Sequence, residues 1–214
     1  MSARVSIASA WLRVLAPPRC PGCDGPLLVE VRSFCAACLP LIERADESRR
    51  PPRSGAAAFV YGGPLADAVL RLKYGGRTEF ASGLGALLAE ESLAYAGSID
   101  RVLPLPLHRL RLRERGFNQS ALLARPVAGA LGVPLDTASL SRVRPTHEQA
   151  SLPRASRAEN VRGAFSALRT LALQRVLLID DVRTTGATLA AAAEALLAAG
   201  CREVNTLALA RAEG

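Results

Sequence analysis

Residues Val176–Thr188 read VLLIDDVRTTGAT, and this run carries the clearest indication of the fold. Its first four residues are apolar and predict a buried strand, which Asp180 and Asp181 follow directly. The turn Thr184–Thr188 is built from Thr, Gly and Ala, and it opens the alanine-rich segment Ala187–Ala199, which predicts a helix. Backbone N–H groups at the start of a helix bind anions, and threonine hydroxyls add donors. The stretch therefore predicts an anion site at the carboxyl end of a strand, where open α/β sheets bind ligands.

The two adjacent carboxylates add a second chemical property. They can accept hydrogen bonds from a pair of vicinal hydroxyls or help to hold Mg²⁺. Each part also has an ordinary structural reading, because an Asp pair can cap a helix and Thr-Thr-Gly can form a simple turn. These ordinary structural roles do not readily explain why all of these residue types occur together in one run.

The same stretch resembles the signature of type I phosphoribosyltransferases, which bind phosphoribosyl diphosphate (PRPP). The resemblance implies that Asp180 and Asp181 bind the ribose hydroxyls and that Mg²⁺ accompanies the PRPP. It also implies a set of residues for the 5-phosphate, namely Thr184, Thr185, Gly186, Ala187 and Thr188.

Strand and helix patterns alternate on both sides of this stretch, from Gly55 onward. Strands are expected at Ala56–Tyr61, Arg101–Leu107, Arg175–Ile179 and Glu203–Ala210, and helices at Gly63–Lys73, Glu79–Ala94, Gln119–Leu131 and Ala187–Ala199. Such alternation predicts an α/β fold with a mostly parallel sheet covered by helices on both faces. Together with the resemblance, it predicts a type I phosphoribosyltransferase-like architecture.

A basic segment follows the expected strand Arg101–Leu107 and runs to Gln119. The loop after that strand is expected beside the anion site. Arg115 and Gly116 are its best candidates for a pyrophosphate group, because a glycine lets backbone amides approach an anion closely. His108 is assigned no role. The alternating arginines at 109, 111 and 113 can equally form a solvated face.

A long polar loop is expected from about Ser141 to Gly163. A polar loop of that length inside a compact domain is typical of a functional lid or of disorder. Closure of such a lid over a leaving group would exclude water. The candidate lid residues are Arg142, Arg144, Gln149 and Arg157.

Three motifs in these basic segments resemble the ComF family. They are RGFNQSALLA at Arg115–Ala124, the R-x-x-x-T-x-x-Q-x-x-L spacing of Arg142–Leu152, and R-x-x-N-x-x-G-A-F at Arg157–Phe165. That family joins an N-terminal cysteine zinc module to a phosphoribosyltransferase-like domain. The resemblance implies participation in DNA uptake during bacterial competence, or an unassigned role. It does not define a transfer reaction.

Four of the five cysteines form two CxxC pairs, Cys20/Cys23 and Cys35/Cys38. Two residues between thiolates let both reach one ion from a tight turn, and two such turns complete a tetrahedral site. A disulfide framework is the alternative, but nothing indicates a secreted protein. A redox CxxC is typically single and opens a helix. The spacing predicts a structural Zn²⁺ with no open coordination position, and Cys201 is expected in the core.

These features divide the chain into a zinc-ribbon-like module at 1–45, a linker at 46–55 and a phosphoribosyltransferase-like domain at 56–214. The module is expected to begin with a short helix that carries Trp11, Leu12 and Leu15, and it is a candidate hood over the acceptor. The linker prediction rests on the polar, Arg- and Pro-rich segment Glu43–Ser54. No apolar window reaches the roughly 18–20 residues that a membrane span needs, and no targeting segment is evident, so a cytoplasmic protein is expected.

Composition favours a folded protein but says little about its partner. Half of the residues are hydrophobic, 21% are charged, and the net charge is +8. Lys73 is the sole lysine, and every other basic side chain is an arginine, a usage that biased coding DNA would also produce. The excess of positive charge is thus weak support for phosphate-bearing ligands.

Three functional hypotheses remain open. The first is an enzyme that displaces pyrophosphate at C1 of PRPP, with Asp180 and Asp181 fixing the ribose and with Mg²⁺, Arg115 or the lid arginines neutralising the leaving group. The second is an accessory protein that binds single-stranded DNA or competence proteins, although the aromatic content of 4% argues against a base-stacking platform. The third is a PRPP sensor without turnover. The sequence names no acceptor.

Overall fold

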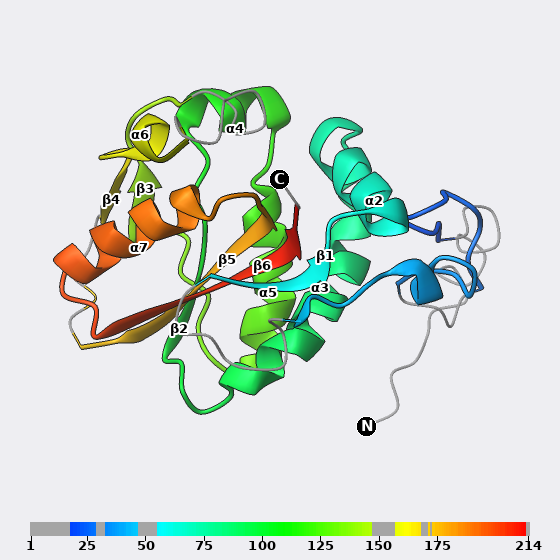
Figure 1. Cartoon of the computed structure of the whole chain (residues 1–214), viewed down its shortest axis with the longest axis horizontal. Coiled ribbons are helices and arrows are strands. Elements are labelled where there is room, and N and C mark those ends of the chain that lie inside the picture. The colour runs from blue at the N-terminus through cyan, green and yellow to red at the C-terminus, as the bar shows by residue number, and fades with distance from the viewer. Residues whose placement is uncertain are drawn as a thin grey trace, which may run out of the picture.

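A four-stranded parallel sheet forms the centre of the protein (Figure 1). The computed structural model describes residues 18–28, 33–46, 55–146, 157–167, 171 and 173–212. The strand order is β1-β6-β5-β2, and each neighbouring pair is parallel. The strands are β1 (Ala56–Val60), β2 (Arg101–Pro104), β5 (Arg175–Arg183) and β6 (Glu203–Arg211).

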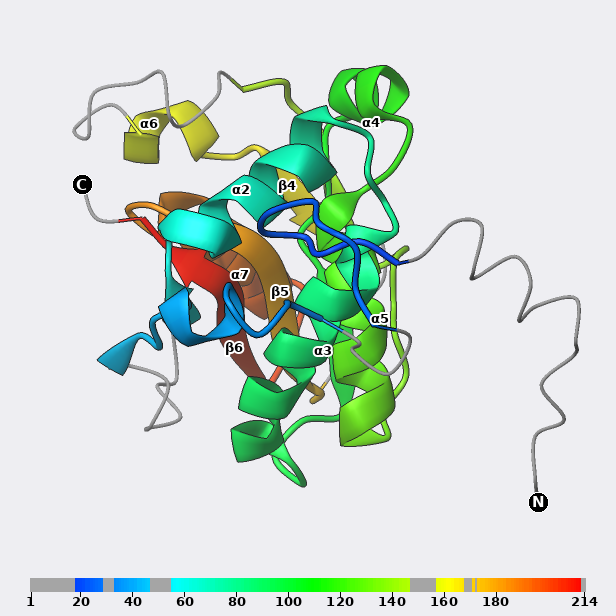
Figure 2. The same cartoon turned by 90° about the vertical axis from the view of Figure 1, so that its right-hand side faces the viewer.

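Helices cover both faces of this sheet, as Figures 1 and 2 show from two directions. The helices on one face are α2 (Gly63–Tyr74), α3 (Phe80–Ser92) and α5 (Gln119–Leu131), and α7 (Ala187–Ala198) covers the other. Successive side chains of β5 serve the two cores: Leu177 packs with the α3 and α5 side, and Leu178 with the α7 side. The predicted α/β fold with a mostly parallel sheet is confirmed.

The predicted element bounds agree closely with the structure except at the carboxyl ends of two strands. The strand expected at Arg101–Leu107 ends at Pro104, and β5 is longer than expected. The helix Gln119–Leu131 has the predicted bounds. Strand β5 was expected to end at Ile179 but continues through Arg183, because Asp180 and Val182 remain in register with Ala208 and Ala210 of β6. The two aspartates thus lie within the last part of the strand. A 3₁₀ turn at Leu93–Tyr95 follows α3.

The basic segment after β2 is a helix, where a loop had been expected. Helix α4 spans Arg109–Arg115, begins after His108 and ends at Gly116, which has a left-handed φ of 81°. His108 Nδ1 accepts a 3.4 Å hydrogen bond from the Leu110 N–H, so this histidine caps the helix. No residue of α4 is buried. The helix therefore leaves no amphipathic pattern in the sequence, and only its end residues indicate it.

The segment expected as a polar loop from about Ser141 to Gly163 also contains regular structure. Strand β3 (Leu140–Arg142) pairs antiparallel with β4 (Phe165–Ala167), and helix α6 spans Arg157–Val161. These elements are too short to produce a periodic pattern. Gln149 lies outside the described residues, as does the expected helix around Trp11.

The cysteine segment packs against the same core as α2 and α3. Cys20, Phe34 and Cys38 belong to the hydrophobic cluster that contains Leu65 of α2 and Leu84 of α3. A 3₁₀ turn at Leu39–Leu41 follows the second cysteine pair.

The chain then runs along the edge of the sheet. The N–H of Ala45 donates to the Ala58 carbonyl at 3.0 Å, and the N–H of Val60 donates to the Glu43 carbonyl at 2.9 Å. The last residues of the expected module 1–45 thus pair with β1, and residues 47–54 of the expected linker lie outside the described residues. Among the described helices, none has the length and hydropathy required to span a bilayer.

Candidate functional site

Two buried aspartates lie at the carboxyl end of β5. Asp180 is 7% exposed and Asp181 is 4% exposed. Asp180 Oδ1 accepts hydrogen bonds from the Ser120 hydroxyl at 3.0 Å and from the Asp181 N–H at 2.8 Å. Asp181 Oδ1 accepts from the Val182 N–H at 2.6 Å, and its Oδ2 lies 2.7 Å from Lys73 Nζ. Helices α5 and α2 thus each supply one partner to the pair.

Charge in this cluster is incompletely balanced. Burial raises the pKa of Asp180 to about 7, and the neighbouring Asp181 carboxylate contributes in the same direction. Burial on its own lowers the pKa of Lys73, but the Asp181 charge and hydrogen bond outweigh it, so this pKa lies above its ordinary value. Lys73 therefore stays an ammonium ion and neutralises one carboxylate. Hydroxyl donors or a cation such as Mg²⁺ would stabilise the second.

The turn after β5 has the features of an anion site. Gly186 caps α7 with a left-handed φ of 80°, which lets the chain turn sharply from strand to helix. Thr185 Oγ1 accepts a 3.3 Å hydrogen bond from the Ala187 N–H. Thr184 to Thr188 are all partly exposed, and the first turn of α7 carries no acidic residue. The dipole of α7 therefore favours a bound anion here.

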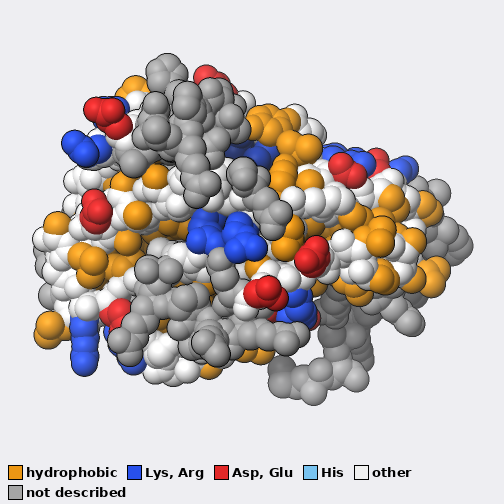
Figure 3. Space-filling model, in the orientation of Figure 1, with side chains coloured by type: hydrophobic (Ala, Val, Ile, Leu, Met, Phe, Trp, Pro, Cys, Tyr) orange, Lys and Arg blue, Asp and Glu red, His pale blue; other side chains and the backbone are white. Residues whose placement is uncertain are grey.

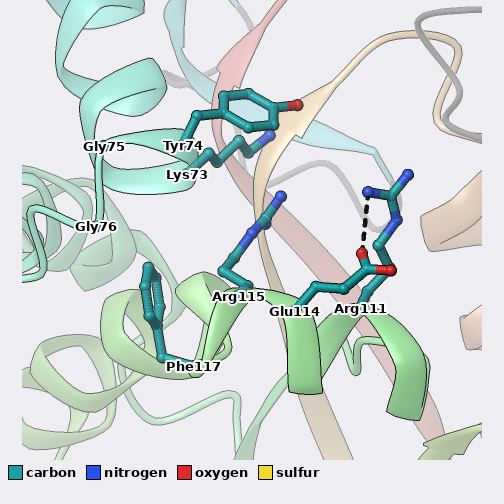
Figure 4. Close-up of a pocket in the computed structure, with 8 residues that line it drawn as sticks. All are labelled: Lys73, Tyr74, Gly75, Gly76, Arg111, Glu114, Arg115 and Phe117. Carbon is teal, nitrogen blue, oxygen red and sulfur yellow. Dashed lines mark hydrogen bonds and ion pairs between the residues drawn. The ribbon is translucent and has the colours of Figure 1, made fainter.

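A cavity of about 450 Å³ lies between the end of α2 and α4 (Figure 4). Its lining residues are Lys73, Tyr74, Gly75, Gly76, Arg111, Glu114, Arg115 and Phe117. Arg115 extends toward Lys73 and Tyr74 in this view, with its guanidinium 5.5 Å from the centroid of the Tyr74 ring. Its Nη1 donates to Gln119 Oε1 at 2.7 Å. Three basic side chains and a Gly-Gly turn make this cavity a second place for an anion.

Lys73 connects the cavity to the acidic pair, and the sequence interpretation had missed it. It lines the cavity and contacts Asp181 directly. A signal was present, because Lys73 is the sole lysine in a chain that otherwise uses arginine. A mostly buried position beside one carboxylate oxygen favours the compact ammonium over a planar guanidinium. The Gly75-Gly76 pair and Ser120 were also missed.

The four candidate lid residues have different surroundings. The Arg142 guanidinium lies 5.4 Å from the centroid of the Phe165 ring and contacts the Thr146 hydroxyl. Burial lowers the pKa of Arg142, and the negative charge of Asp180 opposes that shift.

Arg144 has a different role in the structure. Its Nη2 donates to the carbonyls of Asn160 and Arg162 at 3.0 and 2.6 Å, and so ties the chain after β3 to the end of α6. Arg157 begins α6, and its side chain lies outside what the structure describes, as does Gln149.

Basic side chains are also visible on the molecular surface. Figure 3 shows a compact group of Lys and Arg side chains at the middle of this face, in the same region of the view as the ends of β5 and β6. Hydrophobic side chains lie to its left and right in this view, and acidic side chains lie to its lower right. The excess positive charge is therefore not spread evenly over this face.

The four N-terminal cysteines converge on one point. The Sγ atoms of Cys20, Cys23, Cys35 and Cys38 all lie within 4.8 Å of one another. Cys23 Sγ and Cys35 Sγ are 3.8 Å apart, and no disulfide joins any of the cysteines. Thiolates about 2.3 Å from one Zn²⁺ lie about 3.8 Å from one another in a tetrahedron. The donor set and its spacing therefore fit a metal such as zinc, with all four positions filled by protein.

Comparisons with known proteins agree with this geometry. Residues 118–213 match the family model of the phosphoribosyl transferase domain. The chain is 34% identical to the DNA utilization protein YhgH of Salmonella typhimurium, over 90% of this chain and 83% of that protein. It is 28% identical to the competence protein ComFC of Bacillus subtilis, over 85% of this chain and 72% of that protein.

Two further matches are partial. The competence protein F of Haemophilus influenzae is 34% identical over 53% of this chain and 51% of that protein. Among solved structures, the glutamine PRPP amidotransferase from B. subtilis is 28% identical over 59% of this chain and 25% of that chain, with a TM-score of 0.41. With a phosphoribosyl transferase domain, a cysteine tetrad and relatives matched along most of its length, the chain belongs to the ComF family.

Proposed function

We propose that this protein binds PRPP across the site formed by β5, α7, α2 and α4. One observation carries the proposal: the turn with anion-site features directly follows a buried acidic pair, and Lys73 both contacts Asp181 of this pair and lines a basic cavity. PRPP has the same order of groups, with a phosphate, a ribose diol and a pyrophosphate.

Each part of the ligand then has a partner of matching chemistry. The ribose hydroxyls would bind Asp180 and Asp181, and the 5-phosphate would bind the Thr184–Thr188 turn through N–H and hydroxyl donors. The pyrophosphate would lie in the cavity, near Lys73 and Arg115. Gly116 follows Arg115 at the end of α4, and because it has no side chain it would let the backbone approach the pyrophosphate. Asp180 and Asp181 would help to hold Mg²⁺, which would neutralise charge on the pyrophosphate.

The reaction that this arrangement supports is phosphoribosyl transfer. The bond between C1 and the pyrophosphate oxygen breaks with its electron pair on the pyrophosphate, and an acceptor forms a bond to C1 and gives up a proton. Asp180 and Asp181 would hold the ribose so that C1 faces the acceptor. Arg115 would stabilise the charge that develops on the leaving group. Arg142 is the lid residue that we expect to assist, because its positive charge interacts with the negative charge of Asp180.

The cellular role that we propose is in DNA uptake or utilisation, with the acceptor unidentified. The support is the naming of the relatives as competence and DNA utilization proteins. We also propose the division into a zinc module at 1–45, a linker at 46–55 and a phosphoribosyltransferase-like domain at 56–214. The zinc would be structural, since the four cysteines leave no open position.

Calorimetric titration with PRPP, with and without Mg²⁺, tests the proposal. The wild type should bind with Mg²⁺, and the Asp180→Asn/Asp181→Asn variant should lose binding. A charge-matched control is Glu90→Gln/Glu194→Gln, which changes two exposed carboxylates on α3 and α7 and should bind like the wild type. Absence of binding to folded, zinc-loaded wild type would refute the proposal. Pyrophosphate release with candidate acceptors separates an enzyme from a PRPP sensor.

Binding of single-stranded DNA is a second candidate function that one observation favours. Arg109, Arg111 and Arg113 are exposed on the short helix α4, beside the proposed pyrophosphate cavity. An oligonucleotide held by such phosphate contacts should dissociate steeply as salt is raised. A titration with labelled single-stranded DNA at rising salt tests this, and no binding at low salt would exclude it.

A further inference from the structure

The segment Cys20–Asp24, called the knuckle below, packs against the start of α2. Gly22 approaches Pro64 so closely that an added Cβ would lie 2.7 Å from the Pro64 Cβ. The knuckle is itself closed by two hydrogen bonds of 2.8 Å, from the N–H of Asp24 to the Cys20 carbonyl and from the N–H of Cys20 to the Gly25 carbonyl. It carries the first two of the four metal-type cysteines.

The knuckle also contacts the end of α2 through Arg71. Arg71 Nη1 donates to the Pro21 carbonyl at 2.7 Å and to the Gly22 carbonyl. The backbone carbonyl of Arg71 meanwhile accepts from the N–H of Gly75 at 2.9 Å and of Arg77 at 3.3 Å. One residue therefore holds the knuckle with its side chain and the turn after α2 with its backbone.

Arg77 makes a second connection on the far side of that turn. Its Nη1 and Nη2 donate to the two carboxylate oxygens of Asp24 at 3.2 and 3.0 Å, a forked ion pair. The guanidinium also lies 4.4 Å from the centroid of the Phe80 ring and pairs with Glu79. Arg77 is thereby held between the knuckle and the first residue of α3.

Arg71 and Arg77 bracket Lys73–Gly76, the segment that lines the cavity and supplies the Asp181 ion pair. Only these two side chains, among those described, join the turn to the knuckle by hydrogen bonds. A metal ion on the four thiolates would fix the shape of the knuckle, since thiolate ligation orders the loop that carries it. The position of the turn would then depend on the metal, although no ligand of the metal touches the cavity.

We propose that Arg71 and Arg77 are positioning residues that couple occupancy of the cysteine site to anion binding at the Lys73–Gly76 turn. This rests on the proposed PRPP site and adds its regulation by metal. The zinc is structural for the module and, through these two arginines, it also sets the geometry of the pyrophosphate subsite. Coupling of this kind acts in both directions, so PRPP must raise the affinity for zinc by the same factor as zinc raises the affinity for PRPP.

The first test is a double-mutant cycle on PRPP affinity in zinc-loaded protein. Asp24→Ala and Arg77→Ala should each weaken binding, by about fivefold to twentyfold, within the usual range of coupling between sites. The double variant should be no weaker than the worse single one, because both changes break the same contact. If Asp24→Ala binds like wild type while Arg77→Ala is weak, then Arg77 contacts the ligand itself and the coupling is refuted.

Further variants keep the test independent of folding. Arg71→Ala should weaken binding to a similar extent. The milder Asp24→Asn changes a side chain that is 35% exposed, and it should give a smaller loss in the same direction. Arg202→Ala is the matched control, since this exposed arginine precedes β6 at the opposite end of the sheet and should leave affinity unchanged. Loss of affinity in the control equal to that of Arg71→Ala would overturn the assignment.

The second test measures zinc affinity by competition with the chelator 4-(2-pyridylazo)resorcinol. Saturating PRPP with Mg²⁺ should raise the zinc affinity of the wild type by the same factor by which zinc raises its PRPP affinity. It should have no effect in Arg71→Ala/Arg77→Ala. An equal effect of PRPP in both proteins would contradict coupling through these residues.

Hydrogen exchange separates failure of the coupling from failure of the proposed function. If zinc-loaded wild type binds no PRPP, the proposed function fails. The exchange rates of the amides of residues 73–78 then test separately whether the cysteine site is coupled to the turn. These amides should exchange faster in Asp24→Ala and in the metal-depleted wild type than in the zinc-loaded wild type. Unchanged exchange would refute the coupling whether or not PRPP binds.

Discussion

Among single residues, Lys73 and the two aspartates of β5 matter most, because they form the cluster on which the proposed site depends. A single ammonium group serves two buried carboxylates, and only Asp181 is in direct contact with it. The cluster is therefore under-neutralised without a ligand. Such local imbalance is common at binding sites, where the ligand supplies the missing partner.

Lys73→Met should destabilise the protein, because it leaves the Asp181 carboxylate buried without its cation. Removal of one partner from a buried ion pair typically costs about 3 kcal/mol. Urea unfolding at neutral pH measures the loss. The Lys73→Met/Asp181→Asn variant is the control and should recover a large part of it, since no unpaired charge remains. Equal losses in the single and double variants would contradict the ion pair.

Asp180 should make stability depend on pH in an unusual direction for an aspartate. Its folded-state pKa of about 7 lies above the ordinary value of 3.8, so the folded protein binds more protons between these two values. The free energy of unfolding should therefore be larger at pH 4.5 and fall as pH rises through about 7, relative to Asp180→Asn. The comparison is made from urea unfolding curves of both proteins across this range. A difference that grows with rising pH would contradict the buried, protonated form.

At the scale of elements, α3 and α5 pack closely on one face of the sheet, and their glycines explain how. A Cβ added to Gly85 of α3 would lie 2.8 Å from the Pro126 Cγ of α5, a ring that cannot swing away. Pro126 lies inside its helix, and the absence of a side chain at Gly85 accommodates it. Gly129 of α5 has no atom within 4 Å of an added Cβ.

These two glycines give opposite predictions for the same substitution. Gly85→Ala should destabilise the protein by about 1–3 kcal/mol through overpacking against Pro126. Gly129→Ala should stabilise it by about 0.5 kcal/mol, because alanine loses less backbone entropy in a helix. Thermal unfolding of both variants checks the signs. Stabilisation by Gly85→Ala would mean that α3 and α5 lie further apart than described.

At the scale of the whole molecule, the cysteine segment and the sheet share one core. Cys20, Phe34 and Cys38 belong to the cluster that also contains Leu65 and Leu84, and Glu43 and Ala45 pair with the edge strand β1. The four-cysteine site is thus part of the same folding unit as the sheet, although its two CxxC pairs lie close together in the sequence.

Removal of the metal should therefore lower the Tm of a single cooperative unfolding transition of the whole protein. It should not abolish a separate transition of the cysteine segment. A loss of about 3 kcal/mol would shift Tm by roughly 6–12 °C in a chain of this size. Calorimetry with and without a chelator measures the shift. Cys23→Ser/Cys35→Ser should not respond to chelator, while Cys201→Ser, at a buried thiol outside the tetrad, should respond like wild type. Two transitions, of which the chelator moves only one, would contradict the shared core.

The features that could be predicted from the sequence alone are those formed by residues adjacent in the chain. The run Val176–Thr188 specifies a strand, a turn and a helix in succession, so its backbone groups and side chains lie together in any fold that it adopts. The two CxxC pairs are local in the same way. The α/β class followed from alternating patterns, and for that reason the long helices and strands were predicted closely.

The contacts that these local features make with residues distant in the sequence became evident only from the tertiary structure. The partners of Asp180 and Asp181 are Ser120 on α5 and Lys73 on α2, and the knuckle reaches the Lys73–Gly76 turn through Arg71 and Arg77. Short elements such as α4 bury no residue and so leave no periodic pattern. The physical reason is that local backbone geometry places neighbours in sequence, whereas the docking of helices on the sheet places residues that no local pattern connects.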